Sequence, residues 1–181
     1  MPSTALLVID IQRGAFDGLR CPPMDSPEQL VESAGALVEA AREGGRPIVF
    51  IQHCDGAGEP FEEGTAHWQL HESLVPQAGD TVLKKYASSS FEGTELDALL
   101  KAKGVGELVV CGLQSEFCVS NTTRSALGLG YRVKLAQDGH GTWPSGGRSA
   151  ADIRAEANAK LAEAGAALEG TERLAAALRQ R

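Results

Sequence analysis

Three residue types along this 181-residue chain could together carry out covalent catalysis. Asp10 ends the apolar run ALLVID, Lys84 and Lys85 end the run TVLKK, and Cys118 follows shortly after the run ELVVCG. An aspartate can take the proton of a thiol, an ammonium can stabilise the anion that results, and a thiolate can attack a carbonyl carbon. The three types indicate a nucleophilic hydrolase, provided that the fold brings them together.

Each of these residues also has a simpler explanation. Cys118 stands at the predicted start of a helix, where the helix dipole favours a thiolate, but a buried first-turn cysteine fits the same position. Asp10 is a solvated strand end, a cap for the following turn, or a buried acid with a raised pKa. Strand alternation points Lys84 and Lys85 to opposite faces, so one can reach a site while the other is solvated, and a surface role fits either lysine taken alone. Cys111 lies inside an apolar strand and is expected to pack in the core.

Strand and helix patterns alternate along the chain. Continuous apolar runs, typical of parallel strands buried on both faces, occupy residues 5–10, 47–53, 81–85, 107–112, 131–138 and, more briefly, 166–170. Helical patterns occupy residues 27–43, 93–104, 118–129, 146–165 and 171–180. This alternation predicts an α/β fold, a three-layer α/β/α arrangement around a six-stranded parallel sheet, in a single domain over residues 1–181.

In such folds, ligands bind beyond the carboxyl ends of the strands, which is where the acid, the lysines and Cys118 fall. The irregular stretch 54–80 is expected to form a wall of the site and to influence specificity. Aromatic residues near these loops are candidates for an apolar or planar substrate face, although core packing explains them equally well. These aromatic residues are Phe16, Phe61, Trp68, Phe91, Phe117 and Trp143, and the predicted substrate contacts among them are Phe16, Trp68, Phe91 and Phe117.

The net charge and the apolar content of the chain limit the kinds of partner that we expect. The net charge of -7 argues against a nucleic acid or an anionic membrane as the partner. The stretch MPSTALLVIDIQ lacks the features of a signal peptide, and no segment approaches the ~20 apolar residues needed to span a bilayer. We therefore expect a cytoplasmic protein that acts on a small molecule. Its four cysteines are expected to be reduced, and their spacings match no CxxC zinc motif.

Three stretches together resemble the isochorismatase-like cysteine hydrolases: LLVIDIQ, KKYASSSFEGTELDALL and ELVVCGLQSEFCVSNTTRSALGLGYRVKLAQDGHGT. The resemblance covers nearly the whole chain. Its most specific parts are K-x-x-x-S-[AS]-F-x-G-T-x-L and G-x-x-[TS]-x-x-C-V, with Ser115 where threonine is commoner. It implies a catalytic triad of Asp10, Lys85 and Cys118, since the family lysine lies six positions before the phenylalanine, here Phe91.

The resemblance also implies the geometry around the nucleophile. It implies a cis peptide bond between Leu113 and Gln114, and an oxyanion site made by the backbone N–H groups of Gln114 and Cys118. The implied strand order is 3-2-1-4-5-6. This order separates the strand of Lys85 from that of Asp10 by roughly 9–10 Å, so either Lys85 reaches inward or the order near that edge differs.

Three functional hypotheses follow. The first is an amidohydrolase that cleaves a C–N bond (amide, carbamoyl or lactam) through a thioester, with Asp10 moving the protons. The second is an isochorismatase-type vinyl ether hydrolase, in which Asp10 acts as the acid and no thiol is needed. The third is a non-catalytic binding protein on the same fold. The retained Cys118 favours the first, and the resemblance implies a homodimer or homotetramer.

We predict no metal and no cofactor. The nicotinamidase branch of the family binds a metal through an Asp-x-His pair and a downstream histidine, whereas the corresponding stretch here reads HCDGAGEPF. His53, His67 and His71 remain, and lone loop histidines are more often surface or hydrogen-bonded residues than ligands. His140 is expected to be a structural residue or part of the rim.

Overall fold

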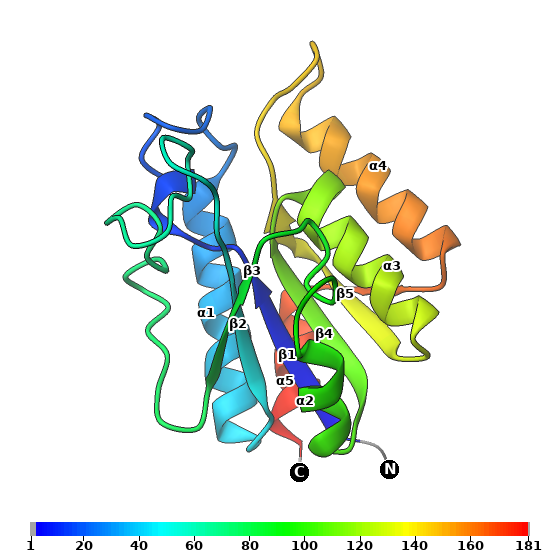
Figure 1. Ribbon diagram of the computed structural model, residues 1–181. Coiled ribbons are helices and arrows are strands. Elements are labelled where there is room, and N and C mark those ends of the chain that lie inside the picture. Colours follow the sequence, from blue (N-terminus) through cyan, green and yellow to red (C-terminus); the bar gives the residue numbers. More distant parts are fainter. Residues whose placement is uncertain (1–2, 181) are drawn as a thin grey trace.

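The computed structural model describes residues 3–180, which contain a six-stranded parallel sheet (Figure 1). Its strands are β1 (Ser3–Ile9), β2 (Ile48–His53), β3 (Thr81–Lys85), β4 (Val105–Leu113), β5 (Arg132–Gly141) and β6 (Ala167–Glu169). Their order is β3-β2-β1-β4-β5-β6, which confirms the predicted order. β1 therefore lies inside the sheet, and its residues Ala5–Ile9 are almost completely buried.

Helices cover both faces of this sheet (Figure 1). They are α1 (Pro27–Glu43), α2 (Leu96–Ala102), α3 (Ser120–Gly128), α4 (Ala150–Glu163) and α5 (Thr171–Arg179). One core cluster joins Leu6 and Val8 of β1 to α1 and α5, and the other joins Leu7 and Ile9 to α2, α3 and α4. This division follows from strand alternation, because successive side chains of β1 point to opposite faces. None of the helices within residues 3–180 is long and apolar enough to cross a membrane.

The chain around Cys118 differs from the predicted helix over 118–129. A π-helical turn spans Ser115–Val119, and α3 begins only at Ser120. The carbonyl of Gln114 accepts hydrogen bonds from the N–H groups of Phe117 (3.2 Å) and Val119 (3.1 Å), the second of which has π-helical spacing. Cys118 therefore lies inside a widened turn, and the prediction that it starts a regular helix is wrong.

β1 and β4 approach each other closely where the site begins. Gly112 has a φ of +127°, and a Cβ atom there would lie 2.1 Å from the carbonyl oxygen of Ile9. Only glycine fits this position. Asp10, which directly follows β1, also has a positive φ, of 53°, a conformation that aspartate adopts more readily than most residues.

A buried glutamine fastens the long loop to the sheet. The side chain of Gln12 donates to the carbonyls of His53 (3.0 Å) and Trp68 (2.8 Å), and its oxygen accepts from the N–H of His53 (2.8 Å). Residues 54–80 form no regular helix or strand, so this clasp and an isolated bridge between Gln12 and Leu70 hold the loop against the sheet edge. The loop is thereby fixed as one wall of the site.

Candidate active site

The acid, the lysine and the cysteine of the predicted triad meet at the carboxyl edge of the sheet. The Lys85 ammonium nitrogen lies 2.9 Å from Asp10 Oδ2 and 3.2 Å from Cys118 Sγ. A carboxylate oxygen of Asp10 also lies within 4.8 Å of the Cys118 sulfur. Lys85 is completely buried and Asp10 is 4% exposed, so water screens these charges little.

Lys85 reaches Asp10 because β3 extends farther than β1. Ile9, Ile51 and Leu83 share one row of the sheet, whereas Lys85 lies two residues beyond that row and pairs with His53. The long lysine side chain crosses the end of β2 and arrives beside Asp10. The strand order is thus compatible with the triad.

Lys84 points away from the site, as strand alternation requires. Its ammonium pairs with Glu63 at the surface and lies 5.0 Å from the ring centre of Trp68. Nearly half of the Lys84 side chain is exposed. Of the two lysines, only Lys85 contacts Asp10 and Cys118.

Burial sets the direction of the pKa shift for Asp10 and Cys118, whereas neighbouring charges set it for Lys85. Burial raises the pKa of Asp10, although Lys85 opposes the shift. Burial also raises the pKa of the Cys118 thiol to about 11, and Asp10 adds to this shift while Lys85 opposes it. Burial alone would lower the pKa of Lys85, but the charges of Asp10 and Cys118 outweigh it and raise the pKa.

These directions correct the helix-start argument, which predicts a lowered thiol pKa. The thiol carries its proton at neutral pH and needs a base beside it. Asp10 Oδ1 is buried and has no hydrogen-bond partner among residues 3–180, so this oxygen can accept the proton.

A cavity of about 190 Å³ opens onto Asp10 and Cys118. Its walls are largely apolar, and its lining residues are Asp10, Cys21, His53, Pro60, Phe61, Leu113, Gln114, Cys118 and Trp143. The peptide bond between Leu113 and Gln114, implied to be cis by the family resemblance, is cis. The Gln114 side chain donates to Thr142 Oγ1 (3.2 Å), and Thr142 donates to Glu116 (2.9 Å). This chain of polar contacts fixes one wall of the cavity.

The four aromatic residues predicted to contact substrate lie outside this lining. Phe16 packs against the α1 side of the core and His71, and Phe91 packs against Tyr131. Trp68 belongs to the long loop and is 9% exposed, and Phe117 is 53% exposed and lines a different hollow. Their sequence positions near site loops do not determine the direction of their side chains, which core packing decides.

Sequence reasoning missed His53 and Cys21 as cavity residues. His53 ends β2 just as Asp10 follows β1 and Lys85 ends β3, so the same strand-end argument could have identified it. Cys21 lies in an irregular segment and carries no comparable signal. Cys111, by contrast, is fully buried in the core, and all four cysteines are free.

Asp10, His53 and Cys118 offer three potential metal-binding atoms within 4.8 Å of one another. The Lys85 ammonium contacts all three residues, at 2.9 Å, 2.9 Å and 3.2 Å respectively. The Lys85 ammonium therefore occupies the place where a metal ion would have to bind, and its positive charge would repel the metal ion. The donor set does not fit a metal while Lys85 is charged.

A buried histidine supports the turn that carries the cysteine. His140 is 1% exposed, and its ring nitrogens contact Ser115 Oγ (2.7 Å) and Asn158 Oδ1 (2.9 Å). Burial lowers the pKa of His140 to about 4, so its ring is neutral. Asn158 donates to the carbonyl of Gln137 (3.1 Å), which fixes the amide and with it the tautomer of His140.

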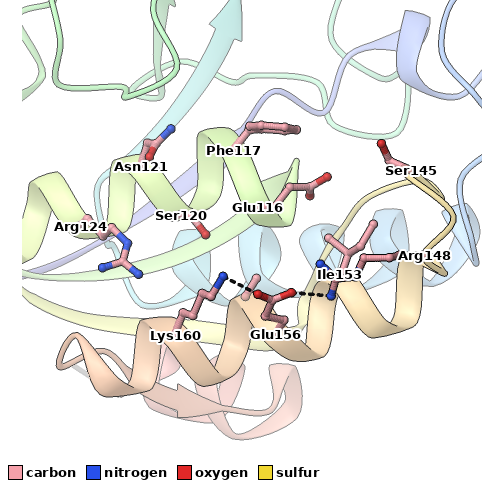
Figure 2. Close-up of a pocket in the computed structure, with 11 residues that line it drawn as sticks. Glu116, Phe117, Ser120, Asn121, Arg124, Ser145, Arg148, Ile153, Glu156 and Lys160 are labelled. Carbon is pink, nitrogen blue, oxygen red and sulfur yellow. Dashed lines mark ion pairs between the residues drawn. The ribbon is translucent and has the colours of Figure 1, made fainter.

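A second hollow, of about 390 Å³, lies between α3 and α4 (Figure 2). Arg148 and Lys160 both pair there with Glu156, as Figure 2 shows. Neither Asp10 nor Cys118 lines it. Glu116, which lines this second hollow, accepts from Thr142, and Thr142 accepts from Gln114 in the lining of the first cavity.

Comparisons with known proteins identify the family and the fold of the chain. Residues 4–173 match the family model of the Isochorismatase domain. The chain is 37% identical over 139 residues to a streptothricin hydrolase of Streptomyces noursei, a match that covers 77% of this chain but only 50% of that protein. The chain thus spans about half the length of that relative.

Two solved structures have the same fold. An isochorismatase from Pseudomonas putida KT2440 superposes with a TM-score of 0.88 at 29% identity, covering 94% of this chain and 89% of that one. An N-carbamoylsarcosine amidase from Thermoplasma acidophilum superposes with a TM-score of 0.79 at 25% identity, covering 94% and 97%. With the domain match over almost the whole length, these similarities show that the chain belongs to the isochorismatase family.

Proposed function

We propose that the protein is a cysteine-dependent amidohydrolase that cleaves a C–N bond of a small amide, carbamoyl compound or lactam. The observation that carries this proposal is the buried Lys85 ammonium in contact with both the Asp10 carboxylate and the Cys118 sulfur. A base, a cation and a nucleophile in mutual contact are the parts that covalent acyl transfer needs.

The first half of the reaction forms the thioester. Asp10 takes the proton of Cys118, and the sulfur attacks the carbonyl carbon while Lys85 balances the negative charge. The carbonyl oxygen becomes an oxyanion, for which the backbone N–H groups of Gln114 and Cys118 are the proposed donors. When the intermediate collapses, the C–N bond breaks, and Asp10 gives its proton to the departing amine or ammonia.

The second half of the reaction hydrolyses the thioester and releases the acyl group as an acid. Asp10, again a carboxylate, removes a proton from water as the water oxygen attacks the thioester carbon. The second intermediate collapses by breaking the C–S bond, and Cys118 leaves as a thiolate beside Lys85. Asp10 then returns its proton to the sulfur, which restores the starting state. The raised pKa of Asp10 makes this carboxylate a stronger base than an exposed aspartate, which favours the repeated transfer.

The cavity itself favours an amide over isochorismate. Isochorismate carries two carboxylates, and no cationic side chain of the described residues is among those lining the cavity. Lys85 lies beneath the cavity and already balances Asp10. The volume of about 190 Å³ is below the usual range for drug-sized ligands, which suits a compact acyl group. The streptothricin hydrolase and N-carbamoylsarcosine amidase relatives also support amide chemistry.

A screen of small primary amides, N-carbamoyl compounds, lactams and isochorismate tests the proposal. We expect release of ammonia or an amine, and an acyl adduct on Cys118 in the mass spectrum of the intact protein. Cys118→Ala should abolish turnover, whereas the matched variant Cys111→Ala should keep it. Full amidase activity in Cys118→Ala would refute the proposal, and pyruvate release from isochorismate without any amine release would favour the vinyl ether reaction.

A further inference from the structure

His53 contacts the catalytic lysine but has no part in the steps above. Its Nδ1 atom lies 2.9 Å from Lys85 Nζ, and its Nε2 atom lies 2.9 Å from Asp55 Oδ1. An ammonium can only donate hydrogen bonds, so Nδ1 accepts and the ring proton resides on Nε2, which donates to Asp55. Asp55, His53 and Lys85 thus form a continuous chain that ends at Asp10 and Cys118.

The ring of His53 is held on several sides. Asp55 Oδ2 accepts from the N–H of Phe61 (3.0 Å), which anchors the carboxylate to the long loop. The backbone of His53 is clasped by Gln12 through its N–H and its carbonyl. These contacts fix the Nδ1 atom in space, because both the backbone and the far side of the ring are restrained.

The ammonium of Lys85 has more acceptors than hydrogens. Asp10 Oδ2 and His53 Nδ1 lie at 2.9 Å, the carbonyl of Ala87 at 3.1 Å and Cys118 Sγ at 3.2 Å. Three hydrogens serve these four atoms. Asp10 Oδ1, buried and without a partner among residues 3–180, is a fifth acceptor within the same cluster.

We infer that His53, oriented by Asp55, is a positioning residue that holds the Lys85 ammonium between Asp10 and Cys118. The inference rests on the proposed function, in which negative charge moves from the Asp10 carboxylate to the Cys118 sulfur when the thiol proton is transferred. The cation serves both anions only if it stays in place during that transfer. His53 and Ala87 supply the neutral acceptors that keep it there.

Loss of the acceptor at Nδ1 should let the ammonium turn toward Asp10 Oδ1. No other group near the cluster would hold the Lys85 ammonium in place. Cys118 is the partner from which the ammonium moves away, and Cys21, which lines the same cavity, is a buried thiol without charge. A lysine drawn toward Asp10 makes that aspartate a weaker base and leaves the thiolate without its counterion.

Two substitutions of His53 test the contacts of its two ring nitrogens one at a time. In His53→Asn the amide oxygen reaches the place of Nδ1 and can accept from Lys85, but contact with Asp55 is lost. In His53→Gln the amide reaches the place of Nε2 and can contact Asp55, but Lys85 loses its acceptor. The first measurement is the rate at which iodoacetamide alkylates Cys118 as a function of pH, read from the peptide that contains it, which needs no amide substrate.

We expect the alkylation rate of Cys118 at pH 7 to fall about tenfold in His53→Gln, because a rise of one unit in the thiol pKa lowers the thiolate fraction tenfold. In His53→Asn the rate should stay within about threefold of the wild-type rate. With a substrate found by the screen, the acidic limb of the kcat/KM profile should move to lower pH in His53→Gln only. Equal alkylation profiles in both variants and the wild type, or equal losses in both variants with unchanged melting temperatures, would overturn the inference.

A measurement on the wild-type protein tests the inference even if the His53 variants fold poorly. The ¹⁵N shifts of the His53 ring at neutral pH should show the proton on Nε2, and a proton on Nδ1 would contradict the inference directly. Failure of the amidase proposal gives a different result. The screen would then show no amine release, while the alkylation difference between the two His53 variants would remain.

Discussion

Lys85 and Asp10 form a buried ion pair of 2.9 Å although the whole of β2 separates their strands. The pair exists because β3 extends two residues past the row that contains Ile9. The site thus depends on the relative lengths of three neighbouring strands, and contacts that fix those strand ends should matter as much as the reacting groups.

Asp10→Asn tests the ion pair. Asparagine tolerates the positive φ at this position, so the backbone should persist while the charge is lost. We expect turnover to disappear and the free energy of unfolding at pH 7 to fall by about 3–5 kcal/mol, because Lys85 is left buried without its counterion. Urea denaturation measures this. Glu72→Gln, which removes an exposed pair with Arg13, is the control and should cost about 0–1 kcal/mol; equal losses would show that burial does not matter.

Gly112→Ala tests the close approach of β1 and β4. A Cβ atom at Gly112 would lie 2.1 Å from the Ile9 carbonyl oxygen, and the φ of +127° is unfavourable for alanine. We expect destabilisation of more than about 4 kcal/mol or failure to fold, seen as loss of a cooperative melt. Gly128→Ala is the matched control, since its Cβ meets nothing within 4 Å, and it should be neutral or stabilising by up to about 1 kcal/mol. Equal behaviour of the two variants would rule out the steric argument.

The buried His140 should make the protein sensitive to acid. Burial lowers its pKa to about 4 from an ordinary value of 6.5, so the unfolded chain binds the proton first as pH falls. The stability contributed by the neutral ring is complete above pH 6.5 and is lost between pH 6.5 and 4, by about 3 kcal/mol in total. Urea midpoints at a series of pH values measure the slope. His140→Gln should flatten it and His67→Gln should not; an unchanged slope in His140→Gln would contradict the assignment.

The buried thiols should make the protein sensitive to alkali. Burial raises the pKa of Cys111 to about 12 and that of Cys118 to about 11, from an ordinary value of 9.0. Above pH 9 the unfolded chain loses thiol protons that the folded chain retains, so stability decreases as pH rises. We expect urea midpoints to fall between pH 9 and 11. The fall should be smaller in Cys111→Ala, and a fall of the same size in that variant would exclude its thiol as a cause.

The sequence by itself determined where the strands lie along the chain and which reactive residues follow them, while the order of the strands was implied only by the family resemblance. Strands buried on both faces must be continuous apolar runs, and the run at 81–85 coincides with β3. Motifs around Asp10, Lys85 and Cys118 named the three residues that the structure brings together. Such signals are local, because periodicity, turn residues and motifs are properties of neighbouring positions along the chain.

Only the tertiary structure decided how those parts act on one another. Whether Lys85 could reach Asp10 depended on strand register, and the place of His53 depended on contacts with Lys85, Asp55 and Gln12 from other segments. The direction of the Cys118 pKa shift depended on burial, which reversed the expectation drawn from a helix start. Distance and burial arise from packing between residues remote in sequence, and no local pattern encodes them.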